Sequence, residues 1–292
     1  MPLTTASTAP TRACRCSTAH CRACIRRFYL QARRGGGCTG QRLINQYSTV
    51  YCNGVYNYFK DYHPRCTRHG HSGNIDVVTA IKWSCNIFFY DVGRRLTSDV
   101  YDAYAYKLGL GQRTGVEVSE AVGRLTTKSD SNYTASLDVQ AAIGQGNTVV
   151  SPIQLATYAA TLANNGTRYR THFVKAILDT NTGEVLSETK PEVMDVIEGT
   201  GNTFELVRQG MKQVPSTISG KISSYPVPIA CKTGTPQRSE TYAPGKHYLN
   251  AMMVAYLPAD DRRSPLALAL STEAMVPVSV IWWWTLQMPI LP

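Results

Sequence analysis

Two apolar segments near the C-terminus constrain the fold more than any other part of the sequence. PIACKTG (228–234) and HYLNAMMVAYLP (247–258) have the length and composition of β-strands, and a polar loop over 236–247 joins them. Amphipathic helical patterns precede these strands, and the chain contains no strand–helix–strand repeat. We therefore predict an α+β fold in which helices flank an antiparallel sheet.

The clearest helical pattern is SPIQLATYAATLANNG (151–166). Ser151 is a favourable N-cap, Pro152 suits the first turn, and Gly166 follows the last turn. The buried stripe of this helix is expected to comprise Leu155, Tyr158, Ala159 and Leu162. Further helices are expected over 74–83, over 87–96, from Ser98 to just before Gly109, and over 203–214, with a β-hairpin over 173–188.

The first 42 residues differ in composition from the rest of the chain. They hold eight arginines, five of the nine cysteines, no lysine and no acidic residue, and they account for +8 of the net charge of +10. They also lack helical or strand periodicity. We interpret residues 1–42 as a disordered or frameshifted leader, 43–270 as the folded domain and 271–292 as an atypical tail. Because the last 250 residues carry only +2, nucleic acid is not an expected partner.

Neither cofactor nor metal is expected from the sequence. LGLGQRTG (108–115) fails the dinucleotide pattern, since its glycines are wrongly spaced and it follows a helix. Two sets of residues could be drawn as zinc sites, but we favour no metal at either. The first set is Cys14, Cys16, His20, Cys21 and Cys24, and the second is His63, Cys66, His69 and His71.

The remaining cysteines have simpler interpretations. Cys52 and Cys66 are able to form a disulfide if the domain faces an oxidising exterior. Cys85 and Cys231 are expected to be buried, small and apolar in character.

The CKTGT segment combines a cation and hydroxyls at the end of a strand. Alternation places Lys232 and Gly234 on one face and Thr233 and Thr235 on the other. The glycine lets a ligand approach the backbone closely, and the Thr235 N–H is able to stabilise an oxyanion. Such an edge suits binding of a substrate carboxylate and relay of protons.

SCN (84–86), which lies between two expected helices, supplies complementary groups. The Ser84 hydroxyl is able to pass a proton, and the Asn86 amide is able to bind both sides of a peptide bond. An S-x-N motif followed far downstream by K-T-G is the pairing found in penicillin-binding proteins and serine β-lactamases.

With these motifs, the chain from 43 to 270 resembles the transpeptidase domain of a class B penicillin-binding protein. The resemblance extends to HGHSGNIDVVTAIKWSCNIFFYDVGRRL, LGLGQRTGVEVSE and AAIGQGNTVVSPIQLATYAATLANNGTRY, in the order of the family. It implies the penicillin-binding-protein and serine β-lactamase-like fold. The loop formed by Gly144, Gln145 and Gly146 is expected to be structural rather than catalytic.

The resemblance also implies a mechanism, peptidoglycan crosslinking by D,D-transpeptidation. A serine of an S-x-x-K motif attacks a D-Ala-D-Ala stem peptide, and an amine of a neighbouring stem peptide takes up the acyl group. Ser84 would relay protons, Asn86 would align the substrate amide, and Lys232 would support Ser84. Thr233, Gly234 and Thr235 would bind the terminal carboxylate of the stem peptide or of a β-lactam.

The resemblance further implies a glycosyltransferase partner and a place on the extracytoplasmic face of the bacterial cell membrane. The sequence shows no signal peptide and no membrane anchor.

The nucleophile motif is missing where the family has it. The only S-x-x-K is SETK (187–190), which follows SCN and lies in the second arm of the expected hairpin. We hypothesise that a wrong reading frame or a mis-joined gene has replaced the helix that carried it, and that the fold is incomplete at both ends. We therefore expect an inactive transpeptidase domain. The alternatives are a non-catalytic remnant that binds a stem peptide or β-lactam, and a relative of class D-like β-lactamases or sensors.

Overall fold

The structure, a computed structural model, describes most of the chain beyond residue 43. The described residues are 44–66, 70–96, 98–197, 202–218, 220–235, 237–243, 246–260, 266–273 and 284–287. The leader proposed for residues 1–42 lies outside them.

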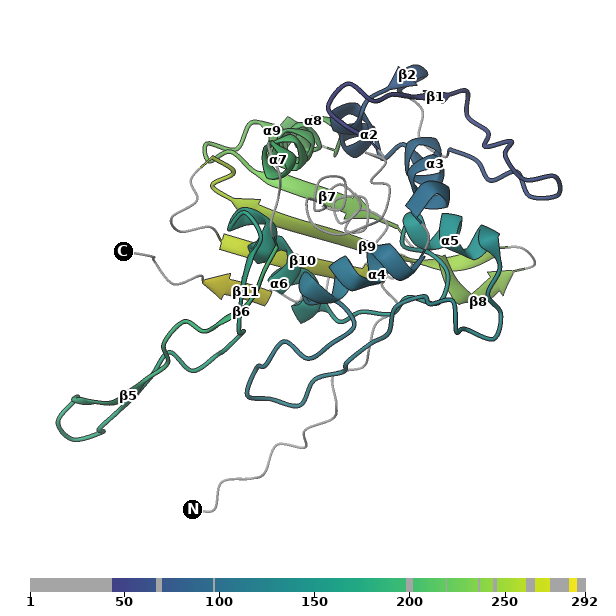
Figure 1. Cartoon of the computed structure of the whole chain (residues 1–292). Coiled ribbons are helices and arrows are strands. Elements are labelled where there is room, and N and C mark those ends of the chain that lie inside the picture. The colour runs from purple at the N-terminus through teal and green to yellow at the C-terminus, as the bar shows by residue number, and fades with distance from the viewer. Residues whose placement is uncertain are drawn as a thin grey trace, which may run out of the picture.

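The centre of the fold is a five-stranded antiparallel sheet (Figure 1). Its strands are β7 (Ala230–Gly234), β8 (Gln237–Ala243), β9 (Lys246–Leu257), β10 (Leu266–Glu273) and β11 (Trp284–Gln287). They follow the order β11-β10-β9-β7, and β8 pairs with the first part of β9. This arrangement confirms the predicted α+β class with an antiparallel sheet. It also places β7, with its K-T-G triplet, at an edge among the described strands.

The prediction of a polar loop over 236–247 is wrong for most of that range. β8 and the start of β9 occupy it, with Gln237 opposite Leu249 and Ala243 opposite Lys246. β9 is 12 residues long and therefore extends beyond the part that β7 covers. Strand pairing at the end of a sheet is satisfied by backbone hydrogen bonds and does not need an apolar sequence.

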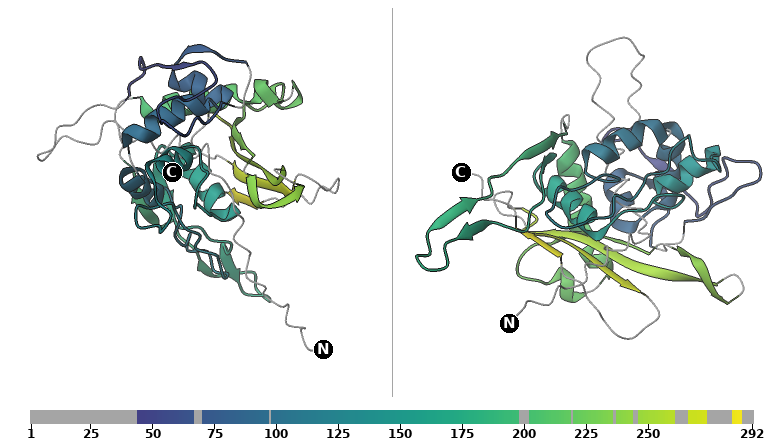
Figure 2. Two further views of the ribbon diagram at one scale, coloured as in Figure 1. Left: turned by 90° about the vertical axis from the view of Figure 1, so that its right-hand side faces the viewer. Right: turned by 90° about the horizontal axis from the view of Figure 1, so that it is seen from below.

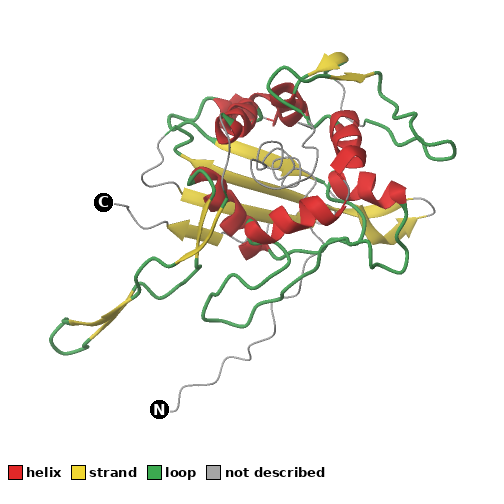
Figure 3. Cartoon of the chain, in the orientation of Figure 1, coloured by secondary structure: helices red, strands yellow, loops and turns green. Residues whose placement is uncertain are grey.

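Most of the helices lie to one side of this sheet (Figures 2 and 3). The longer ones are α2 (Val77–Trp83), α3 (Asn86–Leu96), α4 (Ser98–Lys107), α5 (Ala135–Ala142), α6 (Pro152–Ala163) and α7 (Thr203–Gln213). Two short helices, α8 (Pro215–Ile218) and α9 (Gly220–Ser223), lead into β7.

Helix α6 packs directly on β9 and β10 and confirms the predicted capping. The Ser151 side chain accepts a hydrogen bond from the Gln154 N–H, and Gln154 Oε1 accepts one from the Ser151 N–H. The four-residue buried stripe was too narrow a prediction, because every residue from 153 to 163 is buried. The helix is enclosed on all sides, which its high content of alanine and leucine permits.

The predicted helix over 74–83 begins later than expected. Residues Gly73–Ile75 form strand β2, which pairs antiparallel with β1 (Val50–Cys52). Asp76 then caps α2 by accepting a 2.7 Å hydrogen bond from the Thr79 N–H. The apolar residues of this segment fit either period, so periodicity alone did not place the boundary.

The predicted hairpin is present and projects from the body (Figure 1). β4 (Ala176–Leu178) pairs with β5 (Val185–Glu188), and at its base β3 (Thr167–Tyr169) pairs with β6 (Val193–Val196). None of the described helices is long and apolar enough to span a membrane.

Candidate active site

Ser84 ends helix α2 in a conformation that sets its side chain apart from the helix. Its φ is +56° and its ψ is 46°, in the left-handed region that non-glycine residues seldom adopt. Its N–H and that of Cys85 bond to carbonyl groups of the last turn of α2, at Ile81 and Ala80. Only Ser84 and Cys85 separate the two helices, and α3 starts at Asn86.

Helix α2 is held in place by close packing against α7. A side chain at Gly210 would place its Cβ 2.7 Å from Ile81 Cβ, so only glycine allows the two helices to approach this closely. The approach fixes the helix end from which Ser84 projects.

Lys232 reaches Ser84 from the neighbouring strand. Its side chain is almost completely buried, and its Nζ donates to Ser84 Oγ at 2.6 Å and to the Thr233 carbonyl oxygen at 3.0 Å. A buried ammonium group requires such acceptors, because burial without them costs several kcal/mol. The structure therefore brings together the two motifs that the sequence singled out, which lie 148 residues apart.

The rest of the K-T-G segment lies at the open end of β7. Thr233 and Gly234 are partly buried and Thr235 is exposed. Strand pairing ends after Gly234, and β8 starts at Gln237. A break at this point leaves the Thr235 hydroxyl accessible to a ligand.

Asn86 is the first residue of α3 and is partly buried. Its Nδ2 donates to the Arg65 carbonyl oxygen at 3.3 Å, so one of its amide protons is used by the protein. The side-chain carbonyl remains oriented by that bond and is able to accept a hydrogen bond from a peptide N–H.

The SETK segment lies far from these groups in the fold. Ser187 belongs to β5 and pairs with Ile177 of the projecting hairpin, where the whole strand is exposed. No α-helix carries Ser187 or Lys190. This position does not match that of the family nucleophile, which the resemblance places on a helix that precedes SCN.

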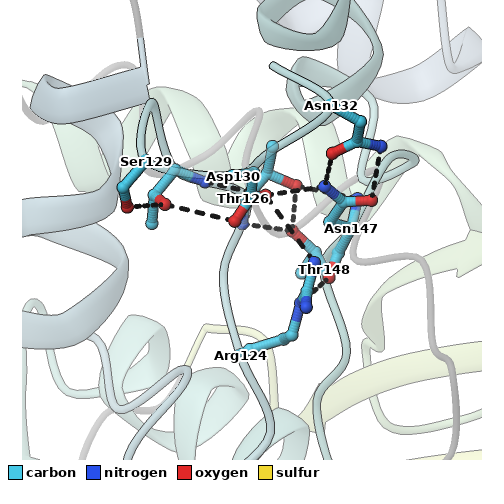
Figure 4. A network of polar contacts seen from close by, with 8 residues as sticks. Arg124, Thr126, Ser129, Asp130, Asn132, Asn147 and Thr148 are labelled. Atoms are coloured by element: carbon cyan, nitrogen blue, oxygen red, sulfur yellow. Dashed lines mark hydrogen bonds and ion pairs between the residues drawn. The ribbon is translucent and has the colours of Figure 1, made fainter.

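The loop of Gly144, Gln145 and Gly146 is fixed by a polar network that involves the next residue, Asn147 (Figure 4). Asn147 Nδ2 donates to Asp130 Oδ2 and to Asn132 Oδ1, each at 2.7 Å. Burial alone would raise the pKa of Asp130, but the hydrogen bonds from Asn147 and Thr127 lower it below its usual value.

The same network continues through buried threonines. Thr126 Oγ1 accepts from the Asn147 N–H at 3.0 Å and shares a 3.0 Å hydrogen bond with Thr148 Oγ1. Gly144 and Gly146 have φ angles of +79° and +81°, which glycine adopts without strain. These contacts support a structural role for the loop.

The structure also assembles a cluster of thiols and an imidazole that sequence reasoning did not find. The ligand atoms of Cys52, Cys66, His71 and Cys85 all lie within 4.8 Å of one another. His71 Nε2 is 3.6 Å from Cys52 Sγ and 3.5 Å from Cys66 Sγ, whereas its buried Nδ1 has no hydrogen-bond partner among the described residues. Three sulfur ligands and one nitrogen form the donor set of a structural zinc site.

This cluster corrects the earlier view of the individual residues. Cys52 and Cys66 are free thiols in the structure and do not form the disulfide that the sequence allowed. Of the histidines grouped with Cys66 in the sequence, His63 is outside the cluster and His69 lies outside the described residues. The four ligands come from three separate segments, so their spacing in the sequence gave no signal.

Two thiols of the cluster have raised pKa values. Burial raises the pKa of Cys52, and the hydrogen bond with Cys66 together with burial raises that of Cys85. Cys231, beside Lys232, is fully buried, and burial raises its pKa to about 11. Cys231 is therefore the inert apolar residue that was predicted, whereas Cys85 belongs to the cluster.

Comparison with known proteins is consistent with this geometry. Residues 40–276 match the penicillin binding protein transpeptidase domain. Penicillin-binding protein 2A of Bacillus subtilis is 30% identical over 219 residues, which are 65% of this chain and 30% of that protein. The peptidoglycan D,D-transpeptidase MrdA of Acinetobacter baumannii is 28% identical over 223 residues, covering 70% of this chain and 32% of that protein.

Solved structures give the same assignment. A peptidoglycan synthase complex, described as coordinating polymerization and crosslinking, superposes with a TM-score of 0.70 at 26% identity, covering 87% of this chain and 42% of that one. The chain thus spans about a third of the length of the curated relatives above. With the family match over most of its length, this chain belongs to the penicillin-binding protein transpeptidase domain family, in its class B branch.

Proposed function

We propose that this chain binds the carboxyl end of a peptidoglycan stem peptide, or of a β-lactam, without forming an acyl-enzyme. The family activity is peptidoglycan crosslinking. The observation that carries the proposal is the 2.6 Å contact between Lys232 Nζ and Ser84 Oγ, which brings together the two motifs that we assign to substrate binding.

The roles of the individual residues follow from their positions. Lys232 Nζ donates to Ser84 Oγ, which leaves the Ser84 O–H able to donate to a bound substrate. Thr235, exposed at the end of β7, and the partly buried Thr233 would donate to the carboxylate. Asn86, oriented by Arg65, would align the penultimate amide.

Covalent catalysis is excluded from the proposal because the 292 residues hold no S-x-x-K ahead of SCN. We assign Ser84 the relay of protons and no nucleophilic role, because the resemblance to the family gives the nucleophile to the serine of an S-x-x-K motif.

By analogy with relatives, we also propose a location at the extracytoplasmic face of the membrane and a glycosyltransferase partner. The solved synthase complex that combines polymerization with crosslinking supports that partnership. The analogy rests on the family and not on this chain alone.

The proposal is tested by titrating the purified chain with an N-acyl-D-Ala-D-Ala peptide and with its C-terminal amide, followed by calorimetry. We expect weak binding of the free acid and at least tenfold weaker binding of the amide, because the amide lacks the charge that the Lys-Thr edge recognises. Equal affinities for the two peptides, or no binding of the acid, would contradict the proposal.

A further inference from the structure

The segment between residues 47 and 62 is unusually rich in aromatic side chains. It holds six tyrosines and phenylalanines in sixteen residues, whereas aromatic residues make up 9% of the whole chain. Two of its tyrosines lie in or next to β1, and four aromatic residues lie in the loop that follows β1. Aromatic side chains at a surface mark binding sites when they gather into a shared surface.

The loop that carries four of these aromatics is closed at its base. The Tyr56 N–H donates to the Pro64 carbonyl oxygen and the Cys66 N–H donates to the Gly54 carbonyl oxygen, each at 2.9 Å. The loop projects from the end of β1 (Figure 1). We refer to residues 54–66 as the aromatic loop.

Tyr56 anchors the aromatic loop to helix α3. It is buried, its ring centroid lies 5.7 Å from that of Tyr90, and its hydroxyl accepts a 3.1 Å hydrogen bond from Arg94 Nε. Asp91 Oδ1 lies 3.4 Å from the same hydroxyl and forms an ion pair with Arg94. The base of the loop is therefore fixed before any ligand arrives, which lowers the entropic cost of binding.

The exposed part of the aromatic loop is a set of rings in mutual contact. Tyr58 stacks on Tyr56 at 6.2 Å between centroids and an interplanar angle of 22°, and Phe59 meets Tyr58 edge-on at 5.2 Å. The Arg94 guanidinium carbon lies 4.1 Å from the centroid of Tyr58. Tyr58 nevertheless remains 58% exposed, so its ring is both supported and accessible.

The aromatic loop also borders the candidate active site. Its last part contains Arg65, whose carbonyl oxygen accepts the hydrogen bond from Asn86 Nδ2 at 3.3 Å. The base of the loop therefore contacts a residue that we assign to the stem peptide.

We propose that the aromatic loop binds the sugar chain of peptidoglycan, with an N-acetylated amino sugar stacked on Tyr58. This inference rests on the proposed function, because the stem peptide at Asn86 would be attached to that sugar chain. The C–H face of a pyranose ring is apolar and matches an exposed aromatic face, while its hydroxyl and acetamide groups need polar neighbours. Such neighbours are interleaved with the rings as Asn57, Lys60, Asp61 and His63.

Other partners fit the aromatic loop less well. A membrane-binding loop needs a continuous apolar face with basic flanks, but this loop interleaves its rings with Asn57, Lys60 and Asp61. A nucleic-acid surface needs a net positive field, and the last 250 residues of the chain carry only +2.

The test is a titration with N-acetylglucosamine tetramer and with peptide-free glycan strands, monitored by ligand-observed NMR. The Tyr58→Ala variant should lose at least tenfold in affinity, whereas Tyr58→Phe should retain binding because it keeps the ring. Tyr225→Ala is the matched control, since Tyr225 is similarly exposed at 53% and lies after α9, outside the aromatic loop. Unchanged circular dichroism of the variants would exclude unfolding as the cause of a loss.

Three results would overturn the inference. They are absence of glycan binding by the parent chain, equal losses in Tyr58→Ala and Tyr225→Ala, and binding of the loop to anionic phospholipid vesicles in place of glycan. Titration of the same preparation with N-acyl-D-Ala-D-Ala separates the two proposals. Retained peptide binding without glycan binding refutes only the aromatic-loop inference, and the reverse refutes only the proposed function.

Discussion

Lys232 Nζ lies 2.6 Å from Ser84 Oγ, and so connects the edge strand β7 to the end of helix α2. The lysine is almost fully buried and also donates to the Thr233 carbonyl. Removal of this lysine would therefore change both the position of Ser84 and the positive charge at the end of β7.

Replacing Lys232 with methionine keeps most of the side-chain volume and removes the charge. We expect the affinity for N-acyl-D-Ala-D-Ala to fall about tenfold to a hundredfold, because a charge-assisted hydrogen bond contributes about 1.5–3 kcal/mol. Calorimetry measures the change. The control is Lys221→Met, on the short helix α9, which should bind normally. Wild-type affinity in Lys232→Met would exclude the lysine from the site.

The Thr235 hydroxyl is assigned to the substrate carboxylate. Thr235→Val removes the hydroxyl at nearly constant volume, and we expect a loss of roughly threefold to tenfold in affinity for the free-acid peptide, equal to about one hydrogen bond. Thr235→Ser keeps the hydroxyl and serves as the control. If valine and serine behave alike, the hydroxyl is not a ligand of the carboxylate.

The thiol–imidazole cluster should bind one zinc ion per chain. We expect zinc to raise the midpoint of thermal unfolding. An ion that binds only the folded state adds about 2.7 kcal/mol to the free energy of unfolding when its free concentration is a hundred times its Kd. Cys52→Ser should reduce the stoichiometry below one, whereas Cys231→Ala should not, because Cys231 is buried outside the cluster. Zinc bound equally by both variants would place the metal elsewhere.

Gln154 stabilises the start of α6 through four polar contacts. Besides capping Ser151, its Nε2 donates to the Val122 carbonyl at 2.8 Å and to the Gln112 carbonyl at 2.5 Å. Gln154→Leu removes three side-chain contacts, to the Ser151 N–H and to the carbonyl groups of Val122 and Gln112, and should lower the free energy of unfolding by about 2–4 kcal/mol. Urea denaturation measures this loss. Gln209→Leu, at an exposed position on α7, should change stability by less than about 0.5 kcal/mol. Equal losses would show that the Gln154 contacts add nothing.

The Asp130 network predicts a pH dependence. The pKa of Asp130 is lower in the folded state than in the unfolded state. Its contribution to the free energy of unfolding is therefore fully present above the unfolded-state pKa of about 3.9, and it disappears as the pH falls through the folded-state pKa. The difference in free energy of unfolding between the parent and Asp130→Asn, about 1 kcal/mol at pH 6, should therefore shrink as the pH falls below the unfolded pKa and vanish below the folded-state pKa. Asp61→Asn, an exposed aspartate outside the network, is the control. A difference that stays constant with pH would contradict the role of the carboxylate.

Local sequence signals predicted the elements that depend on local interactions. The capped helix α6 and the β4–β5 hairpin both formed at the expected places. The signals for them are local, namely Ser151 at the start of the helix and the DTNTG segment (179–183) between the two strands. The sequence also identified SCN and K-T-G as partners in one site, because each motif holds its functional side chains within three neighbouring residues.

Features that depend on distant contacts could not be predicted in the same way. β8 pairs through backbone groups of a polar segment, and Cys85 meets Cys52 and His71 only when α3, β1 and the loop after it pack together. No local period or spacing records such contacts. The roles of Ser84, Asn86 and the K-T-G residues remain predictions, of which the variants above test those of Lys232 and Thr235.

The most direct test of the account is the intact mass of the protein after incubation with excess benzylpenicillin. We predict an unchanged mass after denaturation, together with reversible binding of the drug before denaturation, since the proposal assigns a carboxylate site to Lys232 and Thr235 and involves no acyl-enzyme. A mass increase equal to one penicilloyl group that survives denaturation would contradict the account and would show that a serine of this chain is acylated.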